Sequence, residues 1–220
     1  PVNAATGNFV EVESDLGFTG GAASLEWGRS YSSMNPGSGA FGPGWSSWAE
    51  CGVGFTDDAA RLRLQDGRVV VFPRLGEGWD RAVGESLWLE RGDDGLLLRS
   101  NAGWWWRFTT GGRLVATCAG EGSEVRFSYD QAGRLSRLSH QFGRWIEVVW
   151  DDAMARIVTV RACDGRQVGY RYDQAGRLLS SELGRVTRRS YGWNEAGLIE
   201  TVTDADGVVE VTNGYDAAGR

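Results

Sequence analysis

A repeat of 21 to 22 residues is the feature that most constrains the fold of this chain. An aromatic residue followed by Asp or Asn recurs through the second half, and successive aromatic residues lie 21, 22, 21 and 22 positions apart. The heptapeptide YDQAGRL occurs twice without change, at 129–135 and 172–178. Because a site is usually made once and a structural unit many times, the period predicts a repeat architecture rather than a duplicated active site.

Six copies of the motif can be aligned from Phe108 to the end of the chain. They read FTTGGRL, YDQAGRL, WDDAMARI, YDQAGRL, WNEAGLI and YDAAGR, and the third copy has one residue added and lacks the Gly. We assign a structural role to the motif residues Tyr129, Asp130, Gly133, Arg134, Leu135, Trp150, Asp151, Tyr172, Asp173, Gly176, Arg177, Leu178, Trp193, Asn194, Gly197, Tyr215, Asp216 and Gly219.

Each copy predicts a strand, a tight turn, a return strand and a looser turn. Apolar and polar residues alternate in VRFSYD and QVGYRYD, which is typical of a half-buried strand. The Asp can accept hydrogen bonds from backbone amides two residues on, and the Gly can adopt the positive φ that a short hairpin loop needs. We therefore predict a positive φ at Gly133 and Gly176, and we expect Gln131 and Gln174 to be free to change. The looser turns are expected at Gly143, Gly165, Gly184 and Gly207.

The composition favours the same fold class. The chain has 33 Gly and 11 Trp but only 4 Pro in 220 residues, which indicates many turns and strands rather than a disordered linker. A single hairpin is marginally stable in water, so neighbouring repeats must cover each other's apolar faces. We predict an all-β fold of antiparallel β-hairpin repeats that form a curved or spiralling sheet.

Charge and cysteine content exclude several classes. The formal net charge of −6 argues against a protein whose main partner is nucleic acid, and no apolar run is long enough for a membrane span. The three cysteines are too few for a disulfide framework. We interpret Arg185, Arg188 and Arg189 as solvated surface. The chain begins without Met and ends inside a motif, so we expect it to be a piece of a longer protein.

Two sets of motifs resemble the Rhs/YD-repeat family, whose repeat is named for its Tyr-Asp pair. The first 45 residues resemble the short domain that precedes the repeats in bacterial Rhs proteins, through PVN with Thr6-Gly7, LEWGRSYSS at 25–33 and GAFGPGW at 39–45. The resemblance implies an Rhs N-terminal domain at 1–75 and a YD-repeat β-sheet region at 76–220.

In this family the repeats wind into a hollow shell, and in bacterial polymorphic toxins the shell encloses a variable C-terminal toxic domain. The resemblance therefore implies a non-catalytic structural segment that helps to encapsulate and deliver a toxin in competition between bacteria. The implied partners are the rest of the shell, the toxin domain and components of a secretion apparatus. The implied location is secreted, extracellular or injected into a target cell. No DPxGL-like self-cleavage segment occurs in the chain.

Two other functions stay open. A carbohydrate-binding or adhesion module could stack sugars on Trp104, Trp105 and Trp106, of which the first and third should share one face of a strand. A glycan-acting enzyme would need two carboxylates facing each other across a cleft.

Sequence patterns for catalysis, metals and phosphates are weak. His140 could pair with Cys118 or Cys163, but a single His with scattered cysteines is usually structural. GSGAFGPG lacks the Lys-Ser/Thr of a phosphate loop, and we interpret it as a loop that packs Phe41 and Trp45. DADG at 204–207 fits a hairpin turn better than a calcium loop. We assign no catalytic, cofactor-binding or metal-binding residue.

Overall fold

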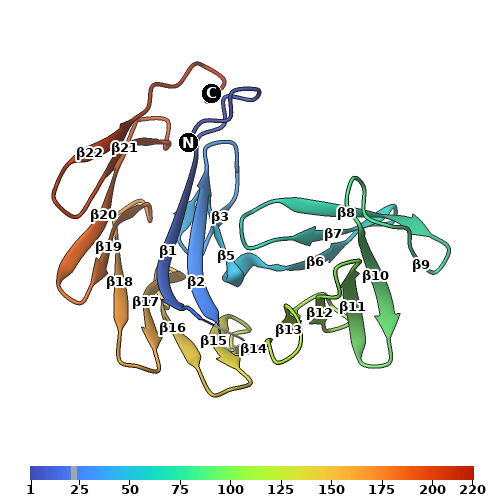
Figure 1. Cartoon of the computed structure of the whole chain (residues 1–220). Coiled ribbons are helices and arrows are strands. Elements are labelled where there is room, and N and C mark those ends of the chain that lie inside the picture. Colours follow the sequence, from blue (N-terminus) through green and yellow to red (C-terminus); the bar gives the residue numbers. More distant parts are fainter. Residues whose placement is uncertain (21–23) are drawn as a thin grey trace.

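The computed structural model describes residues 1–20 and 24–220, which form antiparallel sheets with one short 3₁₀ helix (Figure 1). A sheet of 13 strands runs in sequence order from residue 87 onward, and smaller sheets precede it. The prediction of an all-β fold built from antiparallel hairpins is confirmed. The order of the strands follows from the repeat, because every hairpin pairs with the next one along the chain.

Residues 1–79 form what we call the N-terminal segment. It holds a three-stranded sheet of order β1-β2-β5, a two-stranded ribbon β3-β4 and a four-stranded sheet of order β6-β7-β8-β9. The bounds are β1 Val10–Phe18, β2 Leu25–Ser32, β3 Ser38–Gly39, β4 Gly42–Pro43, β5 Trp45–Ser47, the 3₁₀ helix Trp48–Glu50, β6 Gly52–Phe55, β7 Ala59–Arg63, β8 Val69–Leu75 and β9 Gly78–Trp79.

The 13-stranded sheet, which we call the wall, curls around β1 and β2 (Figure 1). It begins at Leu87, whereas the resemblance implies a boundary at 75/76, and β9 at Gly78–Trp79 still pairs with β8. The strands are β10 Leu87–Gly92, β11 Gly95–Ser100, β12 Trp105–Phe108, β13 Leu114–Cys118, β14 Glu124–Tyr129, β15 Leu135–His140, β16 Trp145–Asp151, β17 Arg156–Ala162, β18 Gln167–Tyr172, β19 Leu178–Leu183, β20 Val186–Trp193, β21 Ile199–Thr203 and β22 Val209–Thr212.

The motif turns have the predicted backbone geometry. Gly133 and Gly176 have φ values of 79° and 73°, and Gln131 and Gln174 are exposed. The first five motifs also carry a shift in register at the aromatic residue, for example between Ser128 and Tyr129. The four looser turns have positive φ as well, at Gly143, Gly165, Gly184 and Gly207.

The third copy shows how the chain turns without its glycine. Ala155 adopts a φ of 51° and is the one non-glycine residue with positive φ in the described part of the chain. The turn is supported by a hydrogen bond from Met154 N to Asp151 Oδ1 of 2.8 Å. A side chain at this φ is strained by contact between its Cβ and the backbone.

We therefore expect Ala155→Gly to stabilise the protein by about 1 kcal/mol, because glycine adopts this conformation without that strain. Chemical denaturation of the variant and the parent measures the difference. Ala132→Gly is the matched control, since Ala132 occupies an exposed motif turn and has no positive φ. Glycine there should be neutral or destabilising, because it only adds freedom to the unfolded chain. Equal effects of the two substitutions would contradict the strain at Ala155.

The core lies between the N-terminal segment and the inner face of the wall. Phe41 and Trp45 are buried, as predicted for GSGAFGPG at 37–44, although this segment is the two-stranded ribbon β3-β4 rather than a loop. They belong to one continuous cluster with apolar residues of the wall such as Leu135, Leu178 and Ile199. The wall thus gains the apolar cover that an isolated sheet of hairpins lacks.

Candidate functional site

In copies two to six, the aromatic residue of the motif donates a hydrogen bond to the motif before it. The acceptor is always the backbone carbonyl of the Leu or Ile that ends the preceding motif. The first motif carries Phe108, which has no polar donor. The five bonds are Tyr129 Oη to Leu114 O at 2.7 Å, Trp150 Nε1 to Leu135 O at 2.8 Å, Tyr172 Oη to Ile157 O at 2.6 Å, Trp193 Nε1 to Leu178 O at 2.7 Å and Tyr215 Oη to Ile199 O at 2.7 Å.

The sequence interpretation gave these aromatic residues a packing role and missed the bond. A signal was present, because copies two to six carry Tyr or Trp and never Phe. Tyr and Trp differ in shape but both combine an apolar ring with a polar donor. The bond therefore accounts for the interchange of these two residues along the repeat.

We expect Tyr129→Phe to destabilise the protein by about 1–2 kcal/mol, because it leaves the carbonyl of Leu114 without its donor. Tyr129→Trp should cost less, since Trp makes the same bond in two other copies. Urea denaturation of both variants tests this order. A Phe variant as stable as the parent would show that the bond contributes nothing.

The Asp and Arg of the motif close the turn together. Asp130 accepts a 2.9 Å bond from the Arg134 amide and a second 2.9 Å bond from Arg134 Nε. Hydrogen bonds from Arg134 hold the pKa of Asp130 below its ordinary value. In a sister copy Asp173 also accepts from the amide of Ala175, two residues on, as the sequence predicts.

The motif Arg also reaches the next copy. Arg113 lies over the ring of Tyr129, with its Cζ atom 4.7 Å from the ring centroid, and Arg134 lies over Trp150 at 5.3 Å. All 23 cationic side chains of the chain are Arg. Arg can pair with a carboxylate and stack on a ring at once, which the ammonium of Lys does less well. The first, second and fourth motifs are thus tied to the next by a ring, a carbonyl and a guanidinium.

A buried arginine joins the N-terminal segment to the wall. Arg29 on β2 is 1% exposed and pairs with Asp15 on β1, with Nε to Oδ2 at 2.7 Å and Nη2 to Oδ1 at 3.1 Å. Its Nη1 donates to Tyr191 Oη at 2.9 Å, and Tyr170 Oη donates to Asp15 Oδ2 at 2.7 Å. The two tyrosines come from β20 and β18 of the wall. We call Asp15, Arg29, Tyr170 and Tyr191 the Arg29 cluster.

The Arg29 cluster is shielded from water by aromatic rings. The guanidinium carbon of Arg29 lies 4.7 Å from the ring centroid of Trp45 and 5.4 Å from each of the Tyr170 and Tyr191 rings. Burial raises the pKa of both tyrosines well above its ordinary value. Both hydroxyls therefore stay protonated, and the cluster keeps one cation opposite one carboxylate.

Aromatic pairs extend this contact along the wall. Rings of the N-terminal segment meet rings of the wall at an angle, an arrangement that adds attraction beyond the buried area. The pairs and their centroid distances are Phe41–Tyr170 at 4.7 Å, Trp45–Tyr191 at 5.2 Å, Tyr31–Trp193 at 5.9 Å, Trp48–Phe127 at 5.1 Å and Trp48–Trp106 at 5.6 Å.

Backbone groups of the motif turns complete the contact. Ile157 N donates to Ala40 O at 2.9 Å. Gly42 has no room for a side chain, because a Cβ there would collide with the carbonyl of Gly176. The N-terminal segment thus follows the row of turns as well as the inner face of the wall.

The expectation of solvated surface for Arg185, Arg188 and Arg189 is wrong for Arg189. Arg189 is half buried and pairs with Glu13 of β1 at 2.9 Å and with Glu210 of the wall. Arg188 is exposed, as expected, and also donates to the carbonyl of Asp15 at 3.3 Å. Arg185 is exposed, as expected of solvated surface. The error arises because Glu13 and Arg189 meet only in the fold, 176 positions apart in sequence.

Glu11 lies beside this ion pair and provides a pH-dependent prediction. Burial and the neighbouring Glu13 raise its pKa from the ordinary value of 4.5, while the N-terminal amine and Arg189 oppose this and Glu210 adds to it. Because the pKa of Glu11 is higher in the folded protein than in the unfolded chain, the folded state loses stability as the pH rises and Glu11 gives up its proton. We expect Glu11→Gln to be more stable than the parent at pH 7, with a difference that vanishes below about pH 4.5.

Thermal unfolding between pH 4 and pH 8 checks this expectation. Glu26→Gln removes one exposed carboxylate from the neighbouring strand and controls for the change in net charge. If both variants shift the unfolding temperature equally at every pH, the burial of Glu11 is not the cause.

The three consecutive tryptophans divide between two faces, as predicted. Trp104 and Trp106 pack against the core, with ring centroids 5.9 Å apart. Trp105 points to the outer face, where Arg107 lies over its ring at 4.8 Å. In the strand register Trp105 lies opposite Arg99, and Arg99 lies opposite Trp88. Of the three candidate sugar-stacking residues, Trp105 alone faces outward.

Within the part of the chain that the structure describes, the remaining candidate residues are not brought together into a catalytic or metal-binding group. His140 is buried, and its Nδ1 accepts from Phe142 N at 3.1 Å. No hydrogen bond joins it to a cysteine in the described ranges, and Cys118 Sγ instead meets Gly120 O at 2.9 Å. The DADG segment is the hairpin turn between β21 and β22. No group of three or more His, Cys, Asp or Glu suited to a metal ion occurs within residues 1–20 and 24–220.

A curved wall of hairpin repeats, tied to an N-terminal segment along its inner face, defines a β-repeat protein. A family model described as "Teneurin YD-shell" matches residues 100–220, more than half of the chain. The chain therefore belongs to the YD-shell proteins of the Rhs/YD-repeat family. A second model, described as a domain of unknown function (DUF6531), matches residues 1–72.

Relatives of known name cover only part of this chain. The "tRNA nuclease WapA" of Bacillus subtilis (strain 168) and the "tRNA3(Ser)-specific nuclease WapA" of Bacillus spizizenii are each 28% identical over 137 residues. The match spans 61% of this chain and 6% of the length of those relatives. Among solved structures, "Crystal Structure of TcdB2-TccC3-TEV" aligns with a TM-score of 0.37 and 13% identity over 67% of this chain and 9% of that one.

No helical segment in the described residues has the length and apolar character that crossing a bilayer requires.

Proposed function

We propose that this chain is a non-catalytic segment of a YD-repeat shell that encloses a C-terminal toxic domain and helps to deliver it. The repeats form part of the wall, and the N-terminal segment closes or starts the shell. The observation that carries the proposal is the Arg29 cluster, which fastens the N-terminal segment to the inner face of the wall by buried polar bonds. A segment held there occupies space that the curved sheet encloses.

The proposal includes a division of the chain and a set of partners. We assign residues 1–75 to an N-terminal domain and residues 76–220 to the YD-repeat region of a longer protein. The motif residues act in the wall through the ladder of aromatic bonds described above. The partners are the rest of the shell, the toxic domain and components of a secretion apparatus. The location is outside the producing cell or inside a target cell.

A protease-protection experiment in the complete gene product tests the shell function. The downstream passenger should resist digestion in the parent and become accessible when Arg29→Met loosens the N-terminal segment. Arg185→Met, at an exposed arginine outside the contact, should leave protection unchanged. A passenger that is digested equally fast in all three proteins would refute enclosure by this segment.

A second candidate function, binding of carbohydrate, is favoured by the outer face of β10 to β12. Trp88 and Trp105 are half exposed there and flank Arg99, which pairs with Glu90. Two rings beside charged groups suit stacking on sugars together with hydrogen bonds to hydroxyls. Glycan-array binding that is lost in Trp105→Ala, and kept in Trp145→Ala elsewhere on the outer face, would support it. If the parent protein binds no glycan on the array, the carbohydrate-binding function is refuted.

A further inference from the structure

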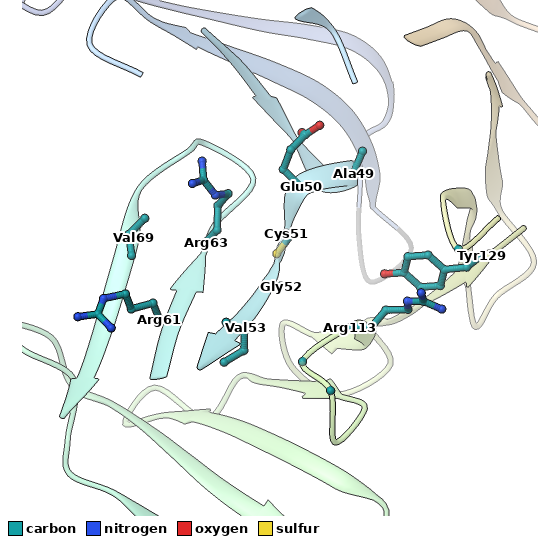
Figure 2. Close-up of a pocket in the computed structure, with 14 residues that line it drawn as sticks. Ala49, Glu50, Cys51, Gly52, Val53, Arg61, Arg63, Val69, Arg113 and Tyr129 are labelled. Atoms are coloured by element: carbon teal, nitrogen blue, oxygen red, sulfur yellow. The ribbon is translucent and has the colours of Figure 1, made fainter. Parts of the chain in front are cut away.

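A pocket of about 540 Å³ opens where the four-stranded sheet of the N-terminal segment meets the first two YD motifs (Figure 2). One side is formed by β6 and β7, and the other by the turn before β13 together with Tyr129. A 2.8 Å hydrogen bond from Val53 N to Gly112 O and a bridge between Gly52 and Arg113 join the two sides. We call this place the seam pocket.

The floor of the seam pocket is bare backbone. Gly52 and Gly54 occupy alternate positions of β6, so one face of this strand has no side chains. A Cβ built on Gly54 would meet nothing within 4 Å, whereas one built on Gly52 would lie 3.0 Å from the carbonyl oxygen of Gly112, so the open part of the strand is at Gly54. On the opposite side Gly111 is exposed, whereas Gly112 is buried against Val53 of β6. An extended peptide can approach such a surface closely enough for backbone contact.

The charges that line the seam pocket are predominantly positive. Arg61 and Arg63 come from β7 and Arg113 from the first motif turn. The described residues offer no ion pair to Arg63 or Arg113, although the chain as a whole carries a net charge of −6. Arg61 donates to Thr56 Oγ1 and pairs with Asp58 at 3.5 Å, on the exposed surface.

Glu50, the acidic residue in the lining of the seam pocket, already accepts hydrogen bonds from neighbouring groups. Glu50 accepts hydrogen bonds from Ala40 N at 2.6 Å, Ser47 N at 2.8 Å and Ser47 Oγ at 2.9 Å. Burial raises its pKa, so Glu50 is a poor partner for a cation across the pocket. The arginines of the seam pocket are left to attract an anion from outside.

We propose that the seam pocket binds an extended acidic peptide segment. Its carboxylates pair with Arg63 and Arg113, and its backbone lies over the glycine floor of β6. Guanidinium groups recognise carboxylates through paired hydrogen bonds. A single-stranded nucleic acid fits less well, because base stacking needs an open aromatic face and Arg113 already covers the ring of Tyr129. The bound segment would link the N-terminal segment to the wall.

The test uses the 220-residue protein and fluorescein-labelled octaglutamate, followed by fluorescence anisotropy. We expect saturable binding that weakens as salt rises, because salt screens exposed charges. Arg63→Gln and Arg113→Gln should each lower the affinity by about tenfold, the order expected for a lost hydrogen bond between charged groups. Arg185→Gln is the matched control, since it removes an exposed charge far from the pocket. Its affinity should equal that of the parent.

Other outcomes would overturn the proposal. These are no binding of octaglutamate, equal binding of octaglutamine, or equal losses in all three variants. Tighter binding of an eight-nucleotide thymidine strand would show that phosphate, not carboxylate, is the ligand. Arg113 also stacks on Tyr129, so thermal unfolding of each variant identifies a loss of fold, and Arg63→Gln gives the result free of that contact. The proposal does not depend on the shell function, and its failure would leave that function untouched.

Discussion

Arg29→Met is expected to destabilise the protein by about 3–5 kcal/mol, the cost of leaving one member of a buried ion pair alone. Asp15 would keep a carboxylate that is almost fully buried, with Tyr170 as its remaining side-chain donor. Tyr191 would lose its donor from Arg29. Because these groups span both parts of the molecule, the loss should loosen the N-terminal segment from the wall. Guanidinium denaturation followed by tryptophan fluorescence measures it.

Two further variants separate the charge effect from the packing effect. Arg185→Met removes an exposed arginine and should change the free energy of unfolding by less than about 0.5 kcal/mol. The double variant Asp15→Leu with Arg29→Met should be more stable than Arg29→Met alone, because it removes the uncompensated carboxylate. If Arg29→Met costs less than about 1 kcal/mol, the Arg29 cluster does not fasten the two parts together.

The repeat predicts the wall because its signals are local. A turn at Gly133 depends on a few neighbouring residues, and alternation within VRFSYD defines a strand without reference to the rest of the chain. The faces of Trp104, Trp105 and Trp106 follow from alternation in the same way. In each case neighbouring residues alone determine the turn or the face of the strand, so the sequence is enough to predict it.

The contact between the two parts depends on residues distant in sequence and was therefore missed. Arg29 shares one face of its strand with Leu25, Trp27 and Tyr31, and an arginine on an apolar face is itself a signal that a buried partner exists. Its partners Tyr170 and Tyr191 lie more than 140 positions away. The hydrogen bond of Tyr129 to Leu114 was missed for a related reason, because its acceptor is a backbone atom that every residue possesses.

Gly112→Ala is expected to have the second large effect, a loss of more than about 3 kcal/mol. Gly112 has a φ of 89°, and a Cβ built there would overlap the carbonyl oxygen of Val53. That carbonyl belongs to β6, the strand that bonds to the turn through Val53 N. The substitution therefore adds a collision to the backbone strain, and it can be relieved only by moving β6 away from the wall.

Gly143→Ala separates strain from collision, because Gly143 has the same φ of 89° and its Cβ would meet nothing within 4 Å. This control should cost only about 1–2 kcal/mol, the strain of a side chain in the left-handed region. Hydrogen exchange read out on β6 and β7 should accelerate in Gly112→Ala and stay unchanged in Gly143→Ala, since local opening follows the loss of local contacts. Equal costs and equal exchange in the two variants would mean that the approach of β6 to the first motif turn does not hold the small sheet in place. The attachment of the N-terminal segment would then depend on the contacts of β1 to β5 with the wall, among them the Arg29 cluster.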